Sequence, residues 1–121
     1  MSSAVSNAPV PTLLAQRVSG VMDRLGLTQD EVGQIVDASG RSVARWIAGA
    51  VVPQKLNKQR LLELAYVAEA VTEVLPQERA NFWMLSPNRL LDHQSPAQRI
   101  HDGKYQDVMD LIEGLAEGIV V

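Results

Sequence analysis

The sequence predicts an all-α protein. Apolar residues recur at intervals of three and four along most of the chain, which is the period of helices that bury one face. No alternating apolar run is long enough for a strand, and residues that cap helices precede most of the periodic segments. With 121 residues, the chain can form one compact domain or two small domains that share a core.

The first three predicted helices have well-marked ends. The first spans about 12–25 and ends at Gly26. Thr28 is placed to cap the second helix, and Glu31 is placed to complete a capping box. The third helix is capped by Ser39, runs through Ala48 and ends at Gly49. The residues expected to face the core in the first two helices are Leu14, Val18, Val21, Leu25, Val32, Ile35 and Val36.

A long fourth helix and a short fifth helix follow a loop that contains Pro53. Asn57 is predicted to cap the fourth helix, which extends to about Val74, and Pro76 marks the start of the next helix. The expected core residues of the fourth helix are Leu61, Leu64, Ala65, Ala68 and Val71. In the fifth helix, the apolar side chains that should face the core are Phe82, Trp83 and Leu85.

Two Ser-Pro pairs predict helix starts nine residues apart in the last third of the chain. At Ser86-Pro87 and Ser95-Pro96, a residue that caps a helix precedes a proline, which is tolerated at the first helical position. Gln98 can complete a capping box with Ser95, and Gly103 can end that helix. A final helix over about 105–117 would place Val108, Leu111, Ile112 and Leu115 toward the core.

Composition argues against an enzyme and against a metal or cofactor site. The chain has no cysteine, and its two histidines, His93 and His101, lack the spacing of a zinc site. The acidic residues around Asp107 and Asp110 have the spacing of a solvated helix face, and no glycine-rich phosphate loop or nucleophile elbow occurs. We therefore expect a binding protein with no catalytic residues and no cofactor.

The ends of the sequence give no sign of export or membrane insertion. The first eleven residues lack a basic start and a long apolar core, and no apolar run approaches the ~18 residues of a membrane span. Without cysteines, nothing calls for an oxidising compartment. We expect a cytoplasmic protein whose residues 1–11 form a flexible tail.

Positive charge is concentrated in one segment of an otherwise acidic chain. Residues 38–62 contain five basic and no acidic side chains, whereas residues 63–121 contain four basic and ten acidic ones. A basic island of this kind suits a surface that contacts nucleic-acid phosphates. A solvated basic helix face explains the same charges equally well.

Residues 27–49 resemble the helix-turn-helix of small repressors. The residues at positions where the two helices of such motifs pack are Val32, Val36, Val43 and Trp46, and Gly33 allows their close approach. This geometry would make Arg41, Ser42 and Arg45 candidate base readers. The candidate phosphate or edge contacts are Gln29, Lys55 and Lys58. Because such motifs read two half-sites, DNA binding would require a homodimer or assembly by a partner.

The last third of the chain resembles the toxin-binding domain of the Xre/MbcA/ParS family of bacterial antitoxins. The residues that carry the resemblance are Trp83, Pro87-Asn88-Arg89, Leu91, Ser95-Pro96, Gly103, Val108, Leu111 and Gly118. One position departs from the family pattern, because His93 stands where glycine is usual. Histidine enters the left-handed region more readily than most side chains, so the turn can be retained at some conformational cost.

The resemblance implies an antitoxin with two units. Residues 12–74 would form the helix-turn-helix domain, and residues 75–121 would bind a cognate RES-type toxin that degrades NAD. By this analogy the last helix and the tail cover the entrance to the toxin active site, and the DNA-binding unit represses the protein's own operon. The expected toxin contacts are Arg89, Arg99, Leu111, Leu115, Glu117, Gly118, Ile119, Val120 and Val121. We therefore expect the protein to form a homodimer or a larger assembly with the toxin.

Two alternatives stay open at this point. The chain can be a free-standing helix-turn-helix regulator whose C-terminal part only dimerises. The apolar end, Ile119-Val120-Val121, can fold back on the protein's own core, or simply fray, instead of entering a toxin. The sequence specifies neither an operator nor a stoichiometry.

Overall fold

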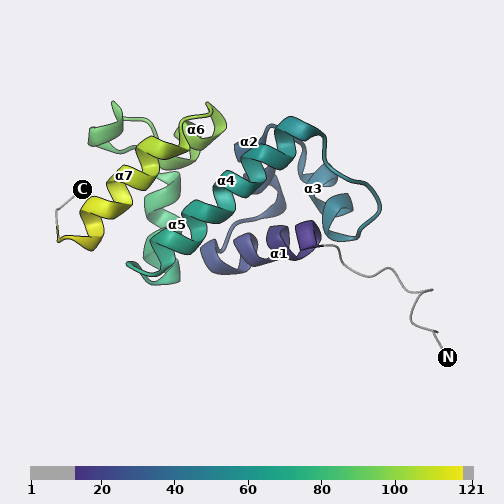
Figure 1. The fold of residues 1–121 in the computed structure, drawn as a ribbon, viewed down its shortest axis with the longest axis horizontal. Helices are drawn as coiled ribbons and strands as arrows, with labels where there is room; N and C mark the ends of the chain where they lie inside the picture. Colours follow the sequence, from purple (N-terminus) through teal and green to yellow (C-terminus); the bar gives the residue numbers. More distant parts are fainter. Residues whose placement is uncertain (1–12, 119–121) are drawn as a thin grey trace.

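The computed structural model describes residues 13–118 and confirms the all-α prediction. Its helices are α1 (Leu13–Leu25), α2 (Gln29–Val36), α3 (Gly40–Ile47), α4 (Lys55–Thr72), α5 (Gln77–Leu85), α6 (Pro96–His101) and α7 (Tyr105–Ala116), with a 3-10 turn η2 (Arg89–Leu91) (Figure 1). No β-strand occurs within the described range. None of the described helices is both long and apolar enough to span a bilayer. The tail predicted at 1–11 and the apolar end at 119–121 lie outside the described residues.

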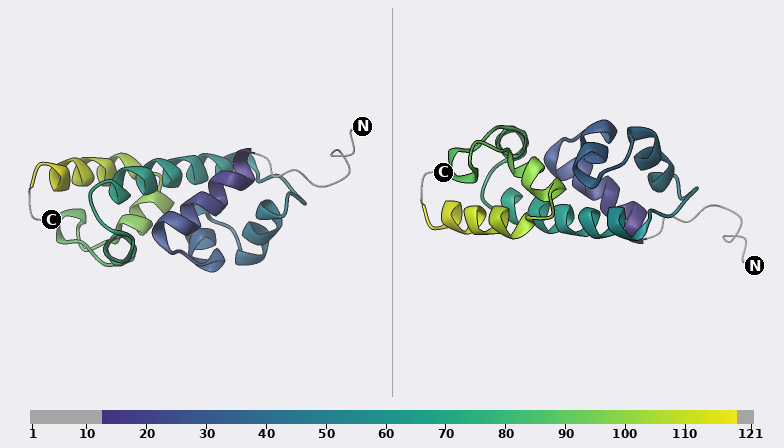
Figure 2. Two further views of the ribbon diagram at one scale, coloured as in Figure 1. Left: turned by 90° about the horizontal axis from the view of Figure 1, so that it is seen from below. Right: turned by 90° about the horizontal axis from the view of Figure 1, so that it is seen from above.

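Helix α4 is the central element of the molecule. It contacts α1 and α2 on the N-terminal side and α5, α6 and α7 on the C-terminal side, while α3 packs against α1 and α2. The molecule is elongated, with α3 toward one end and α7 toward the other (Figure 1), and the views in Figure 2 show the same separation.

One hydrophobic core runs through both predicted units. Val18 and Val43 of the N-terminal helices belong to the same buried cluster as Ile100, Val108 and Ile112 of the C-terminal helices. The residues of α4 that link the two ends are Leu61, Leu64, Val67, Ala68 and Val71. The predicted boundary between residues 74 and 75 therefore divides two units that share one hydrophobic core. The division into a domain of residues 12–74 and a domain of residues 75–121 remains a prediction.

Local capping signals predicted most of the helix ends correctly. The Thr28 side chain accepts from the Glu31 N–H, and the Glu31 carboxylate accepts from the Thr28 N–H, which completes the capping box. Ser39 caps α3 and Ser95 caps α6 through their hydroxyl oxygens. His93 adopts the left-handed conformation, with φ of 67°, so the turn is retained although histidine replaces the usual glycine.

The prediction that Asn57 caps α4 was wrong. Helix α4 begins at Lys55, after Gln54, whose side chain makes no capping hydrogen bond. The Asn57 amide instead donates to the carbonyl oxygens of Val36 (2.7 Å) and Asp37 (3.1 Å) at the end of α2. The side chain that was predicted to cap α4 thus forms tertiary hydrogen bonds to α2 instead.

The prediction that Ser86-Pro87 starts a helix was also wrong. Ser86 follows the last residue of α5, and its hydroxyl donates back to the Phe82 carbonyl oxygen. A proline disfavours helical geometry in the residue before it, so Pro87 helps to end α5. The next turn, η2, is capped by Asn88, whose side-chain oxygen accepts from the Leu90 N–H at 2.9 Å.

Gln98 does not complete the expected capping box with Ser95. Its side-chain amide donates to the carboxylate of Asp102, the residue that follows α6, at 3.0 Å. The Ser95 cap is therefore one-sided, formed by the Gln98 backbone alone.

Several apolar residues predicted to lie in the core are partly or fully exposed instead. In α5 the core-facing residues are Ala80 and Met84, whereas Phe82 is 73% exposed and Leu85 37%. The short helix has too narrow a buried face for the consecutive residues Phe82 and Trp83 together. The other predicted core residues that are only partly buried are Leu14, Ala65, Trp83, Leu111 and Leu115. Of these residues, Phe82, Trp83 and Leu115 line one groove near the end of α7.

Substitution of Gly33 by alanine should weaken the packing of α2 against the turn and the start of α3. A Cβ atom at this position would lie 2.5 Å from the Ala38 carbonyl oxygen, a backbone atom that cannot rotate away. We expect Gly33→Ala to lower the free energy of unfolding by ~1–3 kcal/mol. Gly20→Ala is the control, because Gly20 lies within α1 and a Cβ atom added there would meet no other atom within 4 Å. Equal denaturant midpoints for the two variants would contradict this account.

Candidate functional site

Helices α2 and α3 form a helix-turn-helix whose turn is Asp37–Ser39. Asp37 has φ of 64°, so it provides the left-handed residue that the sharp turn requires. Val43 and Trp46 of α3 are buried, which leaves the opposite face of this helix to solvent. The sequence predicted this arrangement from the spacing of the packed residues.

The solvent face of α3 presents Arg41 and Arg45. Both side chains are exposed, and neither forms an ion pair with another residue in the range 13–118. They lie one helical turn apart, so both can reach the same groove of a duplex. Ser42 is less available, because it is half-buried and its hydroxyl accepts from Ser39 at 3.1 Å.

The remaining DNA candidates lie on α2 and α4. Gln29 is exposed at the first position of α2, and Lys55 and Lys58 are exposed in the first turn of α4. Lys58 lines a small cavity together with Trp46 and Gly49, so it lies near the end of α3. The structure therefore places Lys58 close to the helix that carries the two arginines.

Arg60 belongs to the basic segment 38–62, but its side chain is mostly buried and forms contacts within the protein. Its guanidinium lies 3.2 Å from the Glu63 carboxylate and donates to the His101 carbonyl oxygen at 3.4 Å. The side chain is 17% exposed. The basic residues of segment 38–62 that stay exposed are Arg41, Arg45, Lys55 and Lys58.

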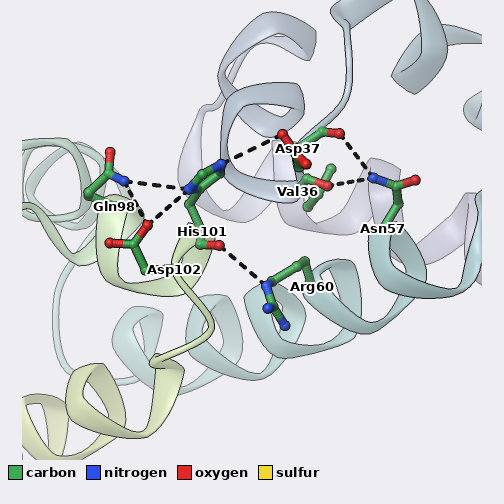
Figure 3. A network of polar contacts seen from close by, with 7 residues as sticks. All are labelled: Val36, Asp37, Asn57, Arg60, Gln98, His101 and Asp102. Atoms are coloured by element: carbon green, nitrogen blue, oxygen red, sulfur yellow. Dashed lines mark hydrogen bonds and ion pairs between the residues drawn. The ribbon is translucent and has the colours of Figure 1, made fainter.

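A polar network joins the turn of the helix-turn-helix to α6 (Figure 3). His101 Nε2 lies 3.7 Å from an Asp37 carboxylate oxygen, and its Nδ1 lies 3.1 Å from Asp102. The hydrogen bond with His101, followed by the one from Gln98, holds the pKa of the Asp102 carboxyl below its ordinary value. Asn57 fixes the other side of the same turn. These contacts and the shared core fix the position of α6 relative to α2 and α3.

Arg99 is an internal clamp in the C-terminal unit. Its guanidinium donates to the Asp107 carboxylate at 2.6 Å, to the Leu91 carbonyl oxygen at 3.1 Å and to the Asp92 carboxylate at 3.3 Å. The side chain is only 13% exposed. Arg99 therefore ties η2 to α7. Because its guanidinium is engaged within the chain, Arg99 is a poorer candidate for toxin contact than the exposed Arg89.

Arg99 and Arg89 should differ sharply in their effect on stability. Arg99→Met leaves a half-buried carboxylate and a backbone carbonyl without their partner, so we expect a loss of ~2 kcal/mol in the free energy of unfolding. Arg89→Met removes an exposed side chain and should change the free energy of unfolding by less than ~0.5 kcal/mol. Denaturant unfolding of both variants measures the difference. Equal losses would show that the Arg99 contacts contribute nothing to folding.

An apolar groove lies where α5, η2 and the end of α7 meet. Its volume is about 550 Å³, and its lining includes Phe82, Trp83, Arg89, Leu90 and Leu115. Phe82 and Leu90 are 73% and 55% exposed, so apolar side chains lie open to water along it. The groove brings together two of the predicted toxin contacts, Arg89 and Leu115.

A second cavity, of about 400 Å³, adjoins the groove at Leu90. Leu111 lines this cavity together with Arg99, Asp107 and Asp110. Leu90 lines both cavities, so Leu111, Leu115 and Arg89 belong to one continuous region of the surface. Sequence reasoning missed Phe82 and Leu90 as site residues. The available signal was the pair of adjacent apolar residues at 82–83 and again at 90–91, since a short turn cannot bury both members.

The other predicted toxin contacts follow the end of α7. Glu117 and Gly118 are exposed, and Gly118 has φ of 86°. Ile119, Val120 and Val121 lie outside the described residues. The described part of the predicted contact region is thus the end of α7 and the groove beside it.

Comparison with known proteins gives consistent results. Residues 68–118 match the antitoxin Xre/MbcA/ParS C-terminal toxin-binding domain. The chain is 65% identical over 109 residues to the mycobacterial cidal antitoxin MbcA of Mycobacterium tuberculosis and of Mycobacterium bovis, which covers 90% of this chain and 96% of each relative. It is also similar to a chain in the crystal structure of the M. tuberculosis MbcT-MbcA toxin-antitoxin complex, with a TM-score of 0.82 and 64% sequence identity over 91% of this chain and 99% of that one.

Proposed function

Since this chain belongs to the Xre/MbcA/ParS family of antitoxins, we propose that it binds a cognate toxin and neutralises it with its C-terminal region. The observation that carries the proposal is the near full-length similarity to a chain of the MbcT-MbcA complex, because that complex joins an antitoxin of this kind to its toxin. The family consists of binding proteins rather than enzymes, so the prediction of a non-enzymatic protein is confirmed.

The surface proposed to contact the toxin is the groove together with the end of α7. Exposed apolar side chains that share one surface region are typical of protein interfaces, and arginine is enriched among the residues that contribute most to binding. Phe82, Leu90 and Leu115 provide the apolar part, and Arg89 provides the exposed cation. Glu117 and Gly118 then lead into residues 119–121, which would reach the toxin active-site entrance.

The partner we propose is a RES-type toxin that degrades NAD, as the family resemblance implies. Co-expression of this chain with the product of the adjacent gene, followed by affinity purification, tests the partnership. A stoichiometric complex that lacks NAD-degrading activity would support the proposal. If the two proteins purify separately, the proposal fails, and a free-standing regulator whose C-terminal part dimerises becomes the better account.

We further propose that α3 binds operator DNA and represses the operon of the protein. The support is the exposed pair Arg41 and Arg45, with Lys58 near the end of the same helix. A single helix-turn-helix reads one half-site, so a homodimer or a larger assembly with the toxin would provide the second copy. Because α3 and α7 lie toward opposite ends of the molecule (Figure 1), one chain can contact DNA and toxin at the same time.

A further inference from the structure

We propose that residues 119–121 of the free protein dock in its own apolar groove and leave it when the toxin binds. The docking concerns the isolated chain and needs no toxin. The release rests on the proposed function, because it requires that the same residues enter the toxin.

The groove offers apolar side chains beside the charged residues Glu78, Arg79 and Arg89, and it has no occupant among the described residues. Phe82 from α5 and Leu90 from η2 line it from two sides and keep most of their surface open to water. Covering such surface is favourable, because water is released from apolar groups. Its volume of about 550 Å³ lies within the range of pockets that hold ligands of ~300–1,000 Å³.

The position of α7 brings the end of the chain to this groove. Leu115, in the last turn of α7, lines the groove, and Gly118 lies just beyond the end of the helix in a left-handed conformation that redirects the chain. Three further residues span at most ~10 Å when extended. Residues 119–121 can therefore reach only surfaces close to the end of α7, and the groove is such a surface.

The chemistry of the segment matches the lining. Ile119, Val120 and Val121 carry apolar, β-branched side chains without charge. Such side chains have restricted rotamers, so docking costs them little conformational freedom. A toxin segment or a second copy of the chain must diffuse to the groove, whereas a tethered segment has an effective concentration in the millimolar range. The tethered segment is therefore the occupant that the free protein favours.

Docking of the segment would compete with toxin binding. A protein whose competent state is only a fraction of the total binds with an affinity reduced by that fraction. If residues 119–121 occupy the groove about nine-tenths of the time, the apparent toxin affinity is about tenfold lower than that of a chain whose groove stays empty.

Methyl NMR of the full chain tests the docking without any toxin. Docked methyl groups of residues 119–121 should show ring-current shifts and cross-relaxation with the rings of Phe82 and Trp83. Phe82→Ala and Leu90→Lys alter exposed groove residues, so both variants should fold and both should return these methyl shifts to random-coil values. Leu13→Lys is the matched control, because Leu13 is 80% exposed at the start of α1 and should leave the shifts unchanged.

Methyl shifts that are already at random-coil values in the unaltered chain would overturn the proposal. So would identical shifts in the unaltered chain, Phe82→Ala and Leu90→Lys. Titration with the purified product of the adjacent gene then separates the two claims. Loss, in the toxin complex, of the cross-relaxation between residues 119–121 and the rings of Phe82 and Trp83 supports release from the groove, whereas cross-relaxation that persists in the complex overturns it. Absence of any complex rejects the proposed function but leaves the NMR result on docking standing.

Discussion

Removal of residues 115–121 should abolish toxin neutralisation while the helical fold remains. Of the described residues in this segment, Leu115 is half-buried, and Ala116, Glu117 and Gly118 are exposed. Val108 and Ile112, which anchor α7 in the core, stay in place. We expect a loss of only ~1 kcal/mol in the free energy of unfolding, because the deleted turn contributes little to the core. The toxin, in contrast, loses the part of the antitoxin that is proposed to cover its active site.

Growth rescue and cellular NAD levels in cells that express the toxin measure this effect, and circular dichroism checks the fold. Deletion of residues 1–11 is a control at the other end of the chain, and it should leave rescue intact. A shortened chain that is still expressed at normal levels and still rescues growth would show that the end of α7 and residues 119–121 are not the inhibitory element.

The double substitution Arg41→Ala with Arg45→Ala should weaken operator binding by at least ~30-fold without changing toxin affinity. Each arginine that reads a base contributes ~1–3 kcal/mol, and each phosphate contact adds about 0.9 to the salt slope. Both side chains are exposed, so the fold should be unaffected. Toxin affinity should be unchanged because α3 lies toward the opposite end of the molecule from α7 (Figure 1).

Gel-shift titration over a range of salt concentrations provides the measurement. Arg17→Ala with Arg24→Ala is the matched control, since it removes the same charge from exposed positions on α1. Equal losses in the two double variants would mean that only net charge matters. Operator affinity that Arg41→Ala with Arg45→Ala leaves unchanged at every salt concentration would remove α3 from the account of DNA binding.

Helix caps and periodicity predicted most elements because those signals act within a few residues. The Thr28 capping box and the Ser39 and Ser95 caps are local, and the structure contains each of them. Asn57 failed as a cap because its partners, the carbonyl oxygens of residues 36 and 37, lie about twenty positions away. Sequence gives no access to a partner that only the tertiary fold supplies.

The candidate site was predictable only in part, for a related reason. Arg41 and Arg45 share a helix face, which the four-residue spacing predicts directly. Arg99 looked as available as Arg89 in the sequence, but the fold pairs Arg99 with Asp107. The groove was not predicted, because its lining comes from α5, η2 and α7, whose packing no local pattern specifies.

Titration of purified toxin with this chain, with NAD consumption as the readout, tests the central claim most directly. If the C-terminal region covers the active site, activity should fall linearly with added antitoxin and reach the background at a fixed small-integer ratio. A tight complex that still consumes NAD at the rate of free toxin would contradict the account.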